Sequence, residues 1–309
     1  MSSVGVPSSV AVGARPEPGR VAAWGAWTWL ALLSRRRVTL VGGLLVALNF
    51  LVAALAPALA PWDPLALDVQ GRLRGPGAGH WFGTDDVGRD VLSRVLYGAR
   101  ISVMVGGLVV VLSVAAGLVV GLAAGYYRRL DGILMRMMDG LMAFPAIILA
   151  IALMASLGPS LQNVIVALGV VYAPRIARIV RGSVLVVREL PYVEAAQALG
   201  ASDVAVIVRH VLPNCLSPVI VQATFIFALA VLGEAALSFL GVGAPPFVPS
   251  WGNILAEGRL YIQQAPWLTV FPGVAIMATI LGLNLFGDGL RDLLDPRLRG
   301  VSGGARSVS

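Results

Sequence analysis

The chain has 309 residues, of which 58% are hydrophobic and 13% are charged. Soluble domains carry about 25% charged residues, so this composition excludes an ordinary soluble domain and indicates an all-α protein with several membrane spans. The net charge is +7, but the basic residues lie between apolar runs, which is typical of membrane topology signals and does not indicate nucleic-acid binding.

The residue types restrict the chemistry that the chain can carry. All 23 basic residues are arginine. A P-loop needs a lysine to contact the nucleotide phosphates, so the chain has no standard P-loop, and a partner has to carry out any ATP chemistry. The single cysteine, Cys215, permits neither an intramolecular disulfide nor a cysteine-based zinc site. We expect no catalytic residue, cofactor or metal in this chain, and we expect it not to be an enzyme.

The first third of the chain contains a tail, one span and a polar segment. Residues 1–33 are rich in Ser, Gly, Pro and Ala, and we expect them to form a disordered or interfacial tail. Residues 34–100 are predicted to hold the first span and an outer segment. In this segment Thr84 or Asp85 is predicted to cap a helix, because short polar side chains favour that position.

The remainder of the chain contains five more apolar runs. Residues 101–290 are predicted to form the membrane core, with a polar loop at 190–213, and residues 291–309 a second tail. Phe144 and Pro145 interrupt the third span, because proline breaks a helix. The six predicted spans cover residues 38–60, 101–126, 133–157, 161–180, 213–240 and 267–286.

Gly117, Gly121 and Gly125 are spaced by four residues in the second predicted span. Small residues at this spacing lie on one face of a helix and allow another helix to approach closely in lipid. The pattern predicts a close helix–helix contact along this face.

The arginines predict the topology. With both termini in the cytoplasm, 17 arginines fall in inner segments and six in outer ones. Basic residues are retained on the cytoplasmic side of a membrane, so this bias indicates six spans with both ends inside.

The loop at 190–213 is the main polar interruption between apolar runs. Pro191 suits the first turn of a helix, and Gly200 suits a left-handed helix end. Ser202 is predicted to cap a second helix that ends near Leu212. From spacing alone, an ordinary amphipathic loop and a slim helix that enters a groove on a partner both remain open.

The same loop resembles a known motif. Glu194-Ala195-Ala196, then Gly200, then Leu212-Pro213 is similar to the EAA loop of ATP-binding-cassette (ABC) importer permeases. His210 departs from the general pattern, but residues 209–214 resemble the version in the dipeptide/oligopeptide/nickel branch. Further segments resemble the second permease of that branch, in the same order along the chain: His80–Asp90, Leu237–Gly243, Pro249–Gly252, Gly287–Asp292 and Asp295–Arg297.

The resemblance implies a type I ABC importer permease fold in the inner membrane of a prokaryote, surrounded by lipid. It implies four kinds of partner: a homologous permease, two ABC ATPases that bind ATP and Mg, and an extracytoplasmic binding protein. Peptides are the expected cargo, with nickel or glutathione as alternatives. In this family the EAA loop docks on the ATPase, so the resemblance implies coupling roles for Tyr192, Glu194, Ala195, Ala196, Ala198, Leu199, Gly200, Arg209, His210 and Pro213.

Other polar residues allow two interpretations each. Asp85, Asp86, Arg89 and Asp90 form either a local salt-bridged cap or part of the docking surface for the binding protein. Glu234, with Ser238, lies in an apolar run, where an acid is costly and often functional.

By helix length, Glu234 could instead lie at the outer interface in contact with water. Arg175, Arg178 and Arg181 share one helix face and either anchor the inner membrane edge or contact the ATPase.

Two rival classes remain at this stage. A secondary transporter driven by an ion gradient predicts paired acids within the spans, and Glu234 is the one candidate. A membrane-embedded enzyme predicts clustered His, Glu or Cys, and the two histidines lie far apart.

Overall fold

The computed structural model describes residues 37–294. Five helices in this range are long and apolar enough to cross a membrane, and a sixth crossing results if one bent pair is counted as a single span. The predicted tail at 1–33, most of the tail at 291–309, and the Asp295–Arg297 motif lie outside the described residues. The long helices are α2 (Arg37–Leu59), α3 (Val91–Tyr126), α6 (Leu161–Val187), α9 (Leu212–Phe239) and α11 (Trp267–Leu294).

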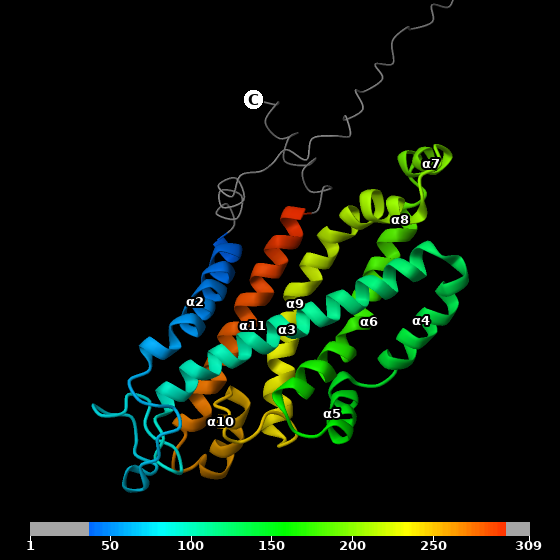
Figure 1. The fold of residues 1–309 in the computed structure, drawn as a ribbon. Helices are drawn as coiled ribbons and strands as arrows, with labels where there is room; N and C mark the ends of the chain where they lie inside the picture. Colours follow the sequence, from blue (N-terminus) through cyan, green and yellow to red (C-terminus); the bar gives the residue numbers. More distant parts are fainter. Residues whose placement is uncertain (1–36, 295–309) are drawn as a thin grey trace, which may run out of the picture.

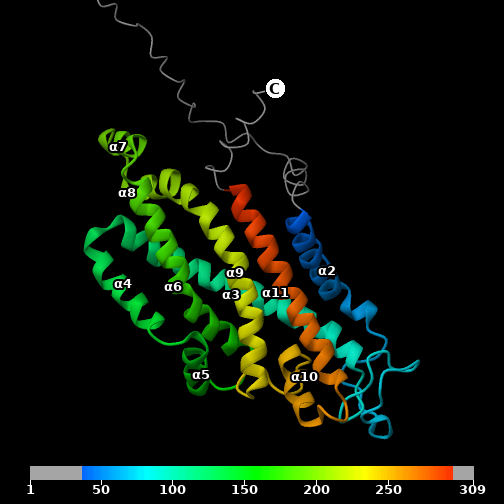
Figure 2. The same cartoon turned by 180° about the vertical axis from the view of Figure 1, so that it is seen from behind.

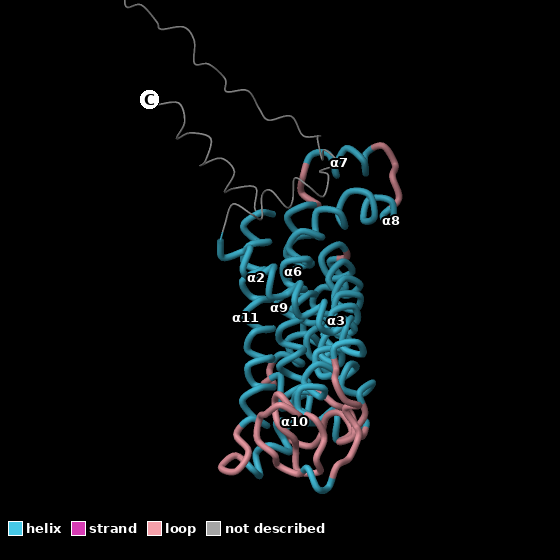
Figure 3. Tube along the Cα trace, turned by 90° about the vertical axis from the view of Figure 1, so that its left-hand side faces the viewer, coloured by secondary structure: helices cyan, strands magenta, loops and turns pink. Residues whose placement is uncertain are grey.

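The helices run side by side between two different ends (Figures 1 and 2). One end carries the short helices α7 (Pro191–Ala198) and α8 (Asp203–Val206), together with the start of α2 and the end of α11 on the other side of the bundle. We call this the α7 end. The opposite end, the α10 end, carries α10 (Trp251–Gly258) and the loops that lead into α3 and α11. Viewed from the side, most of the loop structure gathers at the α10 end (Figure 3).

The third predicted span is a broken one. Helices α4 (Arg128–Met142) and α5 (Ala146–Leu157) meet at 92°. The break falls at residues 143–145, where Pro145 cannot donate a backbone hydrogen bond, so the predicted interruption is confirmed.

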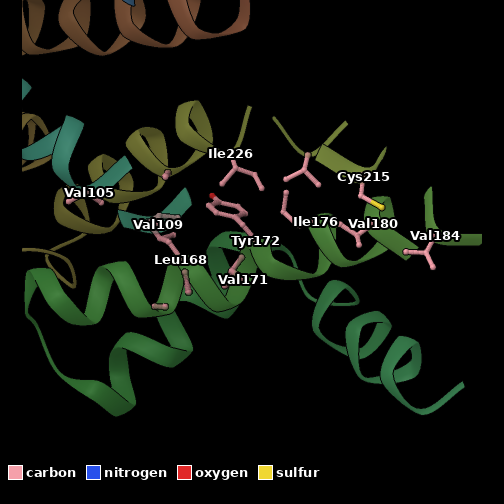
Figure 4. Close-up of a cluster of buried hydrophobic side chains, with 14 of the residues drawn as sticks. Val105, Val109, Leu168, Val171, Tyr172, Ile176, Val180, Val184, Cys215 and Ile226 are labelled. Carbon is pink, nitrogen blue, oxygen red and sulfur yellow. The ribbon is translucent and has the colours of Figure 1, made fainter. Parts of the chain in front are cut away.

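The core lies around α6, which packs against α3 and α9 (Figure 4). The glycine stripe of α3 faces α6, and a Cβ atom at Gly121 would lie 2.6 Å from the backbone oxygen of Ala177. At Gly125 it would lie 2.6 Å from the Val184 Cβ. The predicted close contact is confirmed, because nothing larger than hydrogen fits between the two helices at these positions.

The start of α3 differs from the prediction. Asp90, and not Thr84 or Asp85, caps this helix, with its Oδ2 accepting from the Ser93 N–H at 2.7 Å. The Asp85 carboxylate instead accepts from the backbone N–H groups of Val87 and Arg89 within a turn. Gly88 has a φ of +84°, so the chain reverses there and a helix cannot pass through. The helix then continues unbroken from Val91 to Tyr126.

The second helix of the polar loop also differs from the prediction, because it does not end near Leu212. It continues through a π-helical turn, Ile207–Val211, directly into α9. The Leu212 N–H donates to the carbonyl of Ile207, five residues earlier. A wider turn relieves the clash that the Pro213 ring would make with the carbonyl four residues before it, so the helix is not broken.

Candidate functional site

Helix α7 is a short, well-terminated helix outside the bundle. Pro191 occupies its first turn, where the missing N–H is not needed. At its end Gly200 has a φ of +84°, and the Ala201 N–H donates to the carbonyl of Ala196 at 3.1 Å. This is a Schellman-type cap, which glycine adopts without strain. Ser202 then caps α8 through the Ala205 N–H. The predicted helix, glycine cap and serine cap are all confirmed.

Side-chain hydrogen bonds attach α7 and α8 to the end of α3. The Gln197 amide donates to the Tyr126 hydroxyl at 3.2 Å, and that hydroxyl donates to Asp203 Oδ1 at 3.0 Å. Arg188, just before α7, donates to the carbonyl of Gly125 at 2.8 Å. These hydrogen bonds connect the polar loop directly to the last turn of α3.

A second set of contacts attaches α7 to the beginning of α9. Asn214 donates from its side chain to the Tyr192 hydroxyl at 3.2 Å and to the carbonyl of His210 at 2.6 Å. The rings of Tyr192 and His210 lie 6.0 Å apart. Val193 is fully buried and anchors the inner face of α7.

The outer face of this region is uncovered in the chain. Leu199 is 89% exposed and Val204 is 68% exposed. A hollow of about 860 Å³ lies beside α7, lined in part by Arg128, Arg129 and Glu194. Of the ten residues predicted to couple to the ATPase, two are half-buried (Ala196 and His210) and eight are exposed: Tyr192, Glu194, Ala195, Ala198, Leu199, Gly200, Arg209 and Pro213.

The α10 end is held by a buried ionic cluster. Arg94 is 1% exposed and donates to Asp85 Oδ2 at 2.5 Å and to Glu257 Oε1 at 3.1 Å. Arg89 binds the same two acids, at 2.6 Å and 2.9 Å. The carboxylate oxygens of Asp85, Asp86 and Glu257 lie within 4.8 Å of one another, and the two arginines pair with Asp85 and Glu257. The absence of a metal stays a prediction.

The remaining acids of this segment differ in their surroundings. Asp90 is 2% exposed, caps α3, and accepts a 2.9 Å contact from His80 Nδ1. Asp86 is partly exposed, and burial, followed by the neighbouring charges of Asp85 and Glu257, raises the pKa of its carboxyl group. Of the two interpretations of this segment, its geometry is that of the local salt-bridged cap. Docking of a binding protein by Asp85, Asp86, Arg89 and Asp90 stays a prediction, for which Asp86 offers the most accessible side chain.

Glu234 and Ser238 are both sealed inside the α10 end. Neither exceeds 1% exposure, so the interpretation of Glu234 as a water-exposed interfacial acid is wrong. Ser238 donates to Glu234 Oε1 at 2.8 Å and accepts from the Ala244 N–H at 3.1 Å. The loop after α9 folds back over the carboxylate, which helix length along α9 could not reveal. A role of this pair in the path or an outer gate stays a prediction.

The three arginines of α6 have three different environments. Arg181 makes a two-point contact with Asp131, at 2.5 Å and 2.7 Å, and Arg178 binds Asp139 at 2.6 Å. Both acids lie on α4, so these pairs hold α4 against α6. Arg175 instead stacks over the ring of Tyr172, 5.6 Å from its centroid.

Several structural partners were not found from sequence. Glu257 is 163 positions from Arg94, and Asp203 is 77 positions from Tyr126. No local pattern marks such pairs. The π-helical turn before Pro213 is a further feature that periodicity did not predict.

The fold and the exposed helix α7 define a class: a multi-pass membrane protein with a partner-accessible element at one end. The family model of the binding-protein-dependent transport system inner membrane component matches residues 96–300, and the chain belongs to this family. It is therefore a permease subunit that works in a transporter complex in the inner membrane. Membership excludes the secondary transporter and the membrane-embedded enzyme as classes.

Relatives cover most of the chain. A putative peptide transport system permease protein of Brucella suis is 54% identical over 86% of this chain and 90% of its own length. The dipeptide transport system permease protein DppC of Alkalihalophilus pseudofirmus is 46% identical over 86% of this chain and 88% of its own length. The glutathione transport system permease protein GsiD of Pectobacterium atrosepticum is 43% identical over 86% of this chain and 89% of its own length.

The fold has a match among solved structures. The MetNI methionine ABC transporter in inward-facing conformations matches with a TM-score of 0.54 at 22% identity, over 66% of this chain and 97% of that chain. This likeness confirms the predicted ABC importer permease fold.

Proposed function

We propose that this chain is the permease subunit of an ATP-driven peptide importer, and that α7 is the element through which a partner ATPase moves it. The exposed helix α7 carries this proposal, because side-chain hydrogen bonds attach it to both α3 and α9 while its outer face has no partner within the described residues. ATP and Mg are then bound by two ATPase subunits, and a binding protein delivers the cargo at the α10 end.

The path of the chain supports a cytoplasmic α7 end. The start of α2, the end of α11 and α7 lie at one end of the bundle (Figure 1), and most arginines belong to that side. Reporter fusions after Arg129 and after Arg188 are expected to report cytoplasm, and a fusion at Gly77 the outside. A reversed pattern contradicts this orientation.

Peptides are the cargo that the relatives support. Relatives at 54% and 46% identity are named as peptide and dipeptide permeases, against 43% for a glutathione permease. Uptake of a labelled dipeptide in a deletion strain, restored by this chain and competed by peptides but not by glutathione or nickel chelates, is the expected result. Competition by glutathione alone refutes the peptide assignment.

The docking of α7 can be tested by crosslinking in the assembled transporter. Cys215 is the single cysteine of this chain, so Cys215→Ala removes its own thiol and leaves the introduced one. Ala196→Cys and Ala198→Cys are expected to crosslink to the ATPase subunit, and Gly77→Cys, at the other end, is the control that does not. No crosslink from either α7 position contradicts docking there.

The transmission step has its own test. Gly200→Asp disturbs the cap of α7 but leaves the spans intact, so the variant is expected to insert normally and to lose uptake. Normal uptake by this variant shows that the cap takes no part in coupling.

A further inference from the structure

Arg175 differs from the two arginines that follow it on α6. Arg178 and Arg181 each bind an acid of α4, whereas no acid among the described residues pairs with Arg175. Its contact is the ring of Tyr172, whose hydroxyl donates to the carbonyl of Leu229 on α9 at 3.1 Å. Arg175 is thus a cation at the boundary of α6 and α9 that no carboxylate of residues 37–294 balances.

Arg175 lies near the middle of α6, on a helix apolar enough to cross a membrane. It lies 14 residues from Leu161 and 12 residues from Val187, the two ends of the helix. At 1.5 Å per residue these separations are about 21 Å and 18 Å. The side chain of Arg175 therefore reaches neither end of α6. Charged residues within transmembrane helices commonly face a bundle interior or a water-filled path and mark sites of substrate passage.

A groove begins one turn beyond Arg175 on α6, at Ile179, and lies toward the α7 end. It has a volume of about 630 Å³ and is bounded by α6, α9 and α11. Ile179, one turn from Arg175 on the same face of α6, lines it. Its polar wall comes from α9 and α11 and consists of Asn214, Ser217, Gln222 and Arg291. An apolar span has no need of such side chains, but a peptide backbone in transit can bond to them.

We propose that Arg175 binds the C-terminal carboxylate of the peptide as it passes along this groove. This inference rests on the proposed function, because the cargo must carry a carboxylate. Guanidinium binds carboxylate through two parallel hydrogen bonds, and the stacking on Tyr172 holds its plane in place. The C-terminal carboxylate is present on every linear peptide, so one arginine can serve cargoes of any sequence.

The first test measures the charge in the groove without transport. In the Cys215→Ala background, Ile179→Cys places a thiol one turn from Arg175. The rates of its reaction with an anionic and a cationic thiosulfonate reagent are measured in the assembled transporter. Adding Arg175→Gln is expected to lower the anionic-to-cationic rate ratio by about fivefold or more. An unchanged ratio overturns the proposal, since it shows that a partner subunit's acid neutralises Arg175 or that the groove is not part of the path.

The second test measures uptake with the binding protein and ATPases unchanged. Arg175→Gln is expected to lower uptake of a labelled dipeptide about tenfold, the scale of a lost charged hydrogen bond, while basal ATP hydrolysis and complex assembly stay normal. Arg175→Lys, which keeps the charge, is expected to recover part of the rate. The matched control is Arg178→Gln, which alters an acid-paired arginine of the same helix and is expected to stay within about twofold of wild type.

The third test measures whether a bound peptide protects the thiol at position 179 from the reagents. A free-acid dipeptide is expected to slow the labelling of Ile179→Cys, and its C-terminal amide, added at the same concentration, to slow it less. Equal protection by the two, or wild-type uptake by Arg175→Gln, overturns the role of the carboxylate. If the wild-type transporter carries no peptide at all, the proposed function fails, whereas the reagent ratio still reports separately whether Arg175 forms an anion site.

Discussion

The two ends of the molecule are built in opposite ways. At the α10 end, Arg94, Asp85 and Glu234 are buried, and a Cβ atom at Gly252 would lie 2.5 Å from the carbonyl oxygen of Ala235. At the α7 end, Leu199 is 89% exposed and a Cβ atom at Gly200 would meet nothing within 4 Å. Regions with few buried contacts open at a lower free energy than packed ones. The difference separates a rigid frame from an end whose outermost helix has few buried contacts.

The contrast between the two ends is tested most directly by removing a buried charge at the α10 end. Arg94→Met leaves Asp85 and Glu257 without one of their cations, and we expect a loss of about 3–5 kcal/mol in the free energy of unfolding. Arg209→Met, an exposed arginine at the α7 end, is the control and should change it by less than about 0.5 kcal/mol. Thermal unfolding in detergent measures both, and equal losses would contradict the contrast between the ends.

The packing of α3 against α6, between the two ends, is tested by adding a side chain at a glycine. Gly121→Val forces a side chain against Ala177 and Val180, and we expect a cost of about 1–3 kcal/mol from overpacking α3 against α6. Gly107→Val in the same helix has no atom within 4 Å of the new Cβ and should be close to neutral. The same unfolding assay applies. A neutral Gly121→Val would show that the two helices separate easily.

A smaller and more local effect is expected at the α7 end. Gly200→Ala places a side chain at a φ of +84°, which costs about 1–2 kcal/mol. The strain should fray α7 without unfolding the bundle, so hydrogen exchange is expected to accelerate in residues 190–203 alone. Gly182→Ala, in α6 with no nearby atom, is the control and should leave exchange unchanged. Faster exchange throughout the bundle would show that α7 is part of the rigid frame.

The smallest effect concerns pH at the α10 end. Burial and neighbouring acids raise the pKa of Asp86 above its unfolded value, so the folded state holds this proton more tightly. This group therefore opposes folding as the pH rises from its unfolded pKa of 3.8 through the higher folded value. Asp86→Asn should remove that dependence and slightly raise stability at neutral pH. Unfolding curves of both proteins between pH 4 and pH 7 measure the difference, and parallel curves would contradict it.

Features that depend on near neighbours were predictable from the sequence. The glycine stripe of α3, the break at Phe144 and Pro145, and the cap at Gly200 each follow from residue type and spacing, and each is present. The start of α3 was not predictable in this way. The Asp85 carboxylate accepts hydrogen bonds within a turn and from two arginines, so Asp90 caps the helix instead.

The sequence by itself determined the membrane class, the order of the spans and the short helix beside them, because hydrophobic periodicity and helix caps act within a few residues. Only the tertiary structure decided which charges meet. It brings Glu257 to Arg94, seals Glu234 beneath a loop, and supplies acids to Arg178 and Arg181 but none, among the described residues, to Arg175. Such pairs form between helices that are distant in the chain, so they depend on packing across the bundle and not on local spacing.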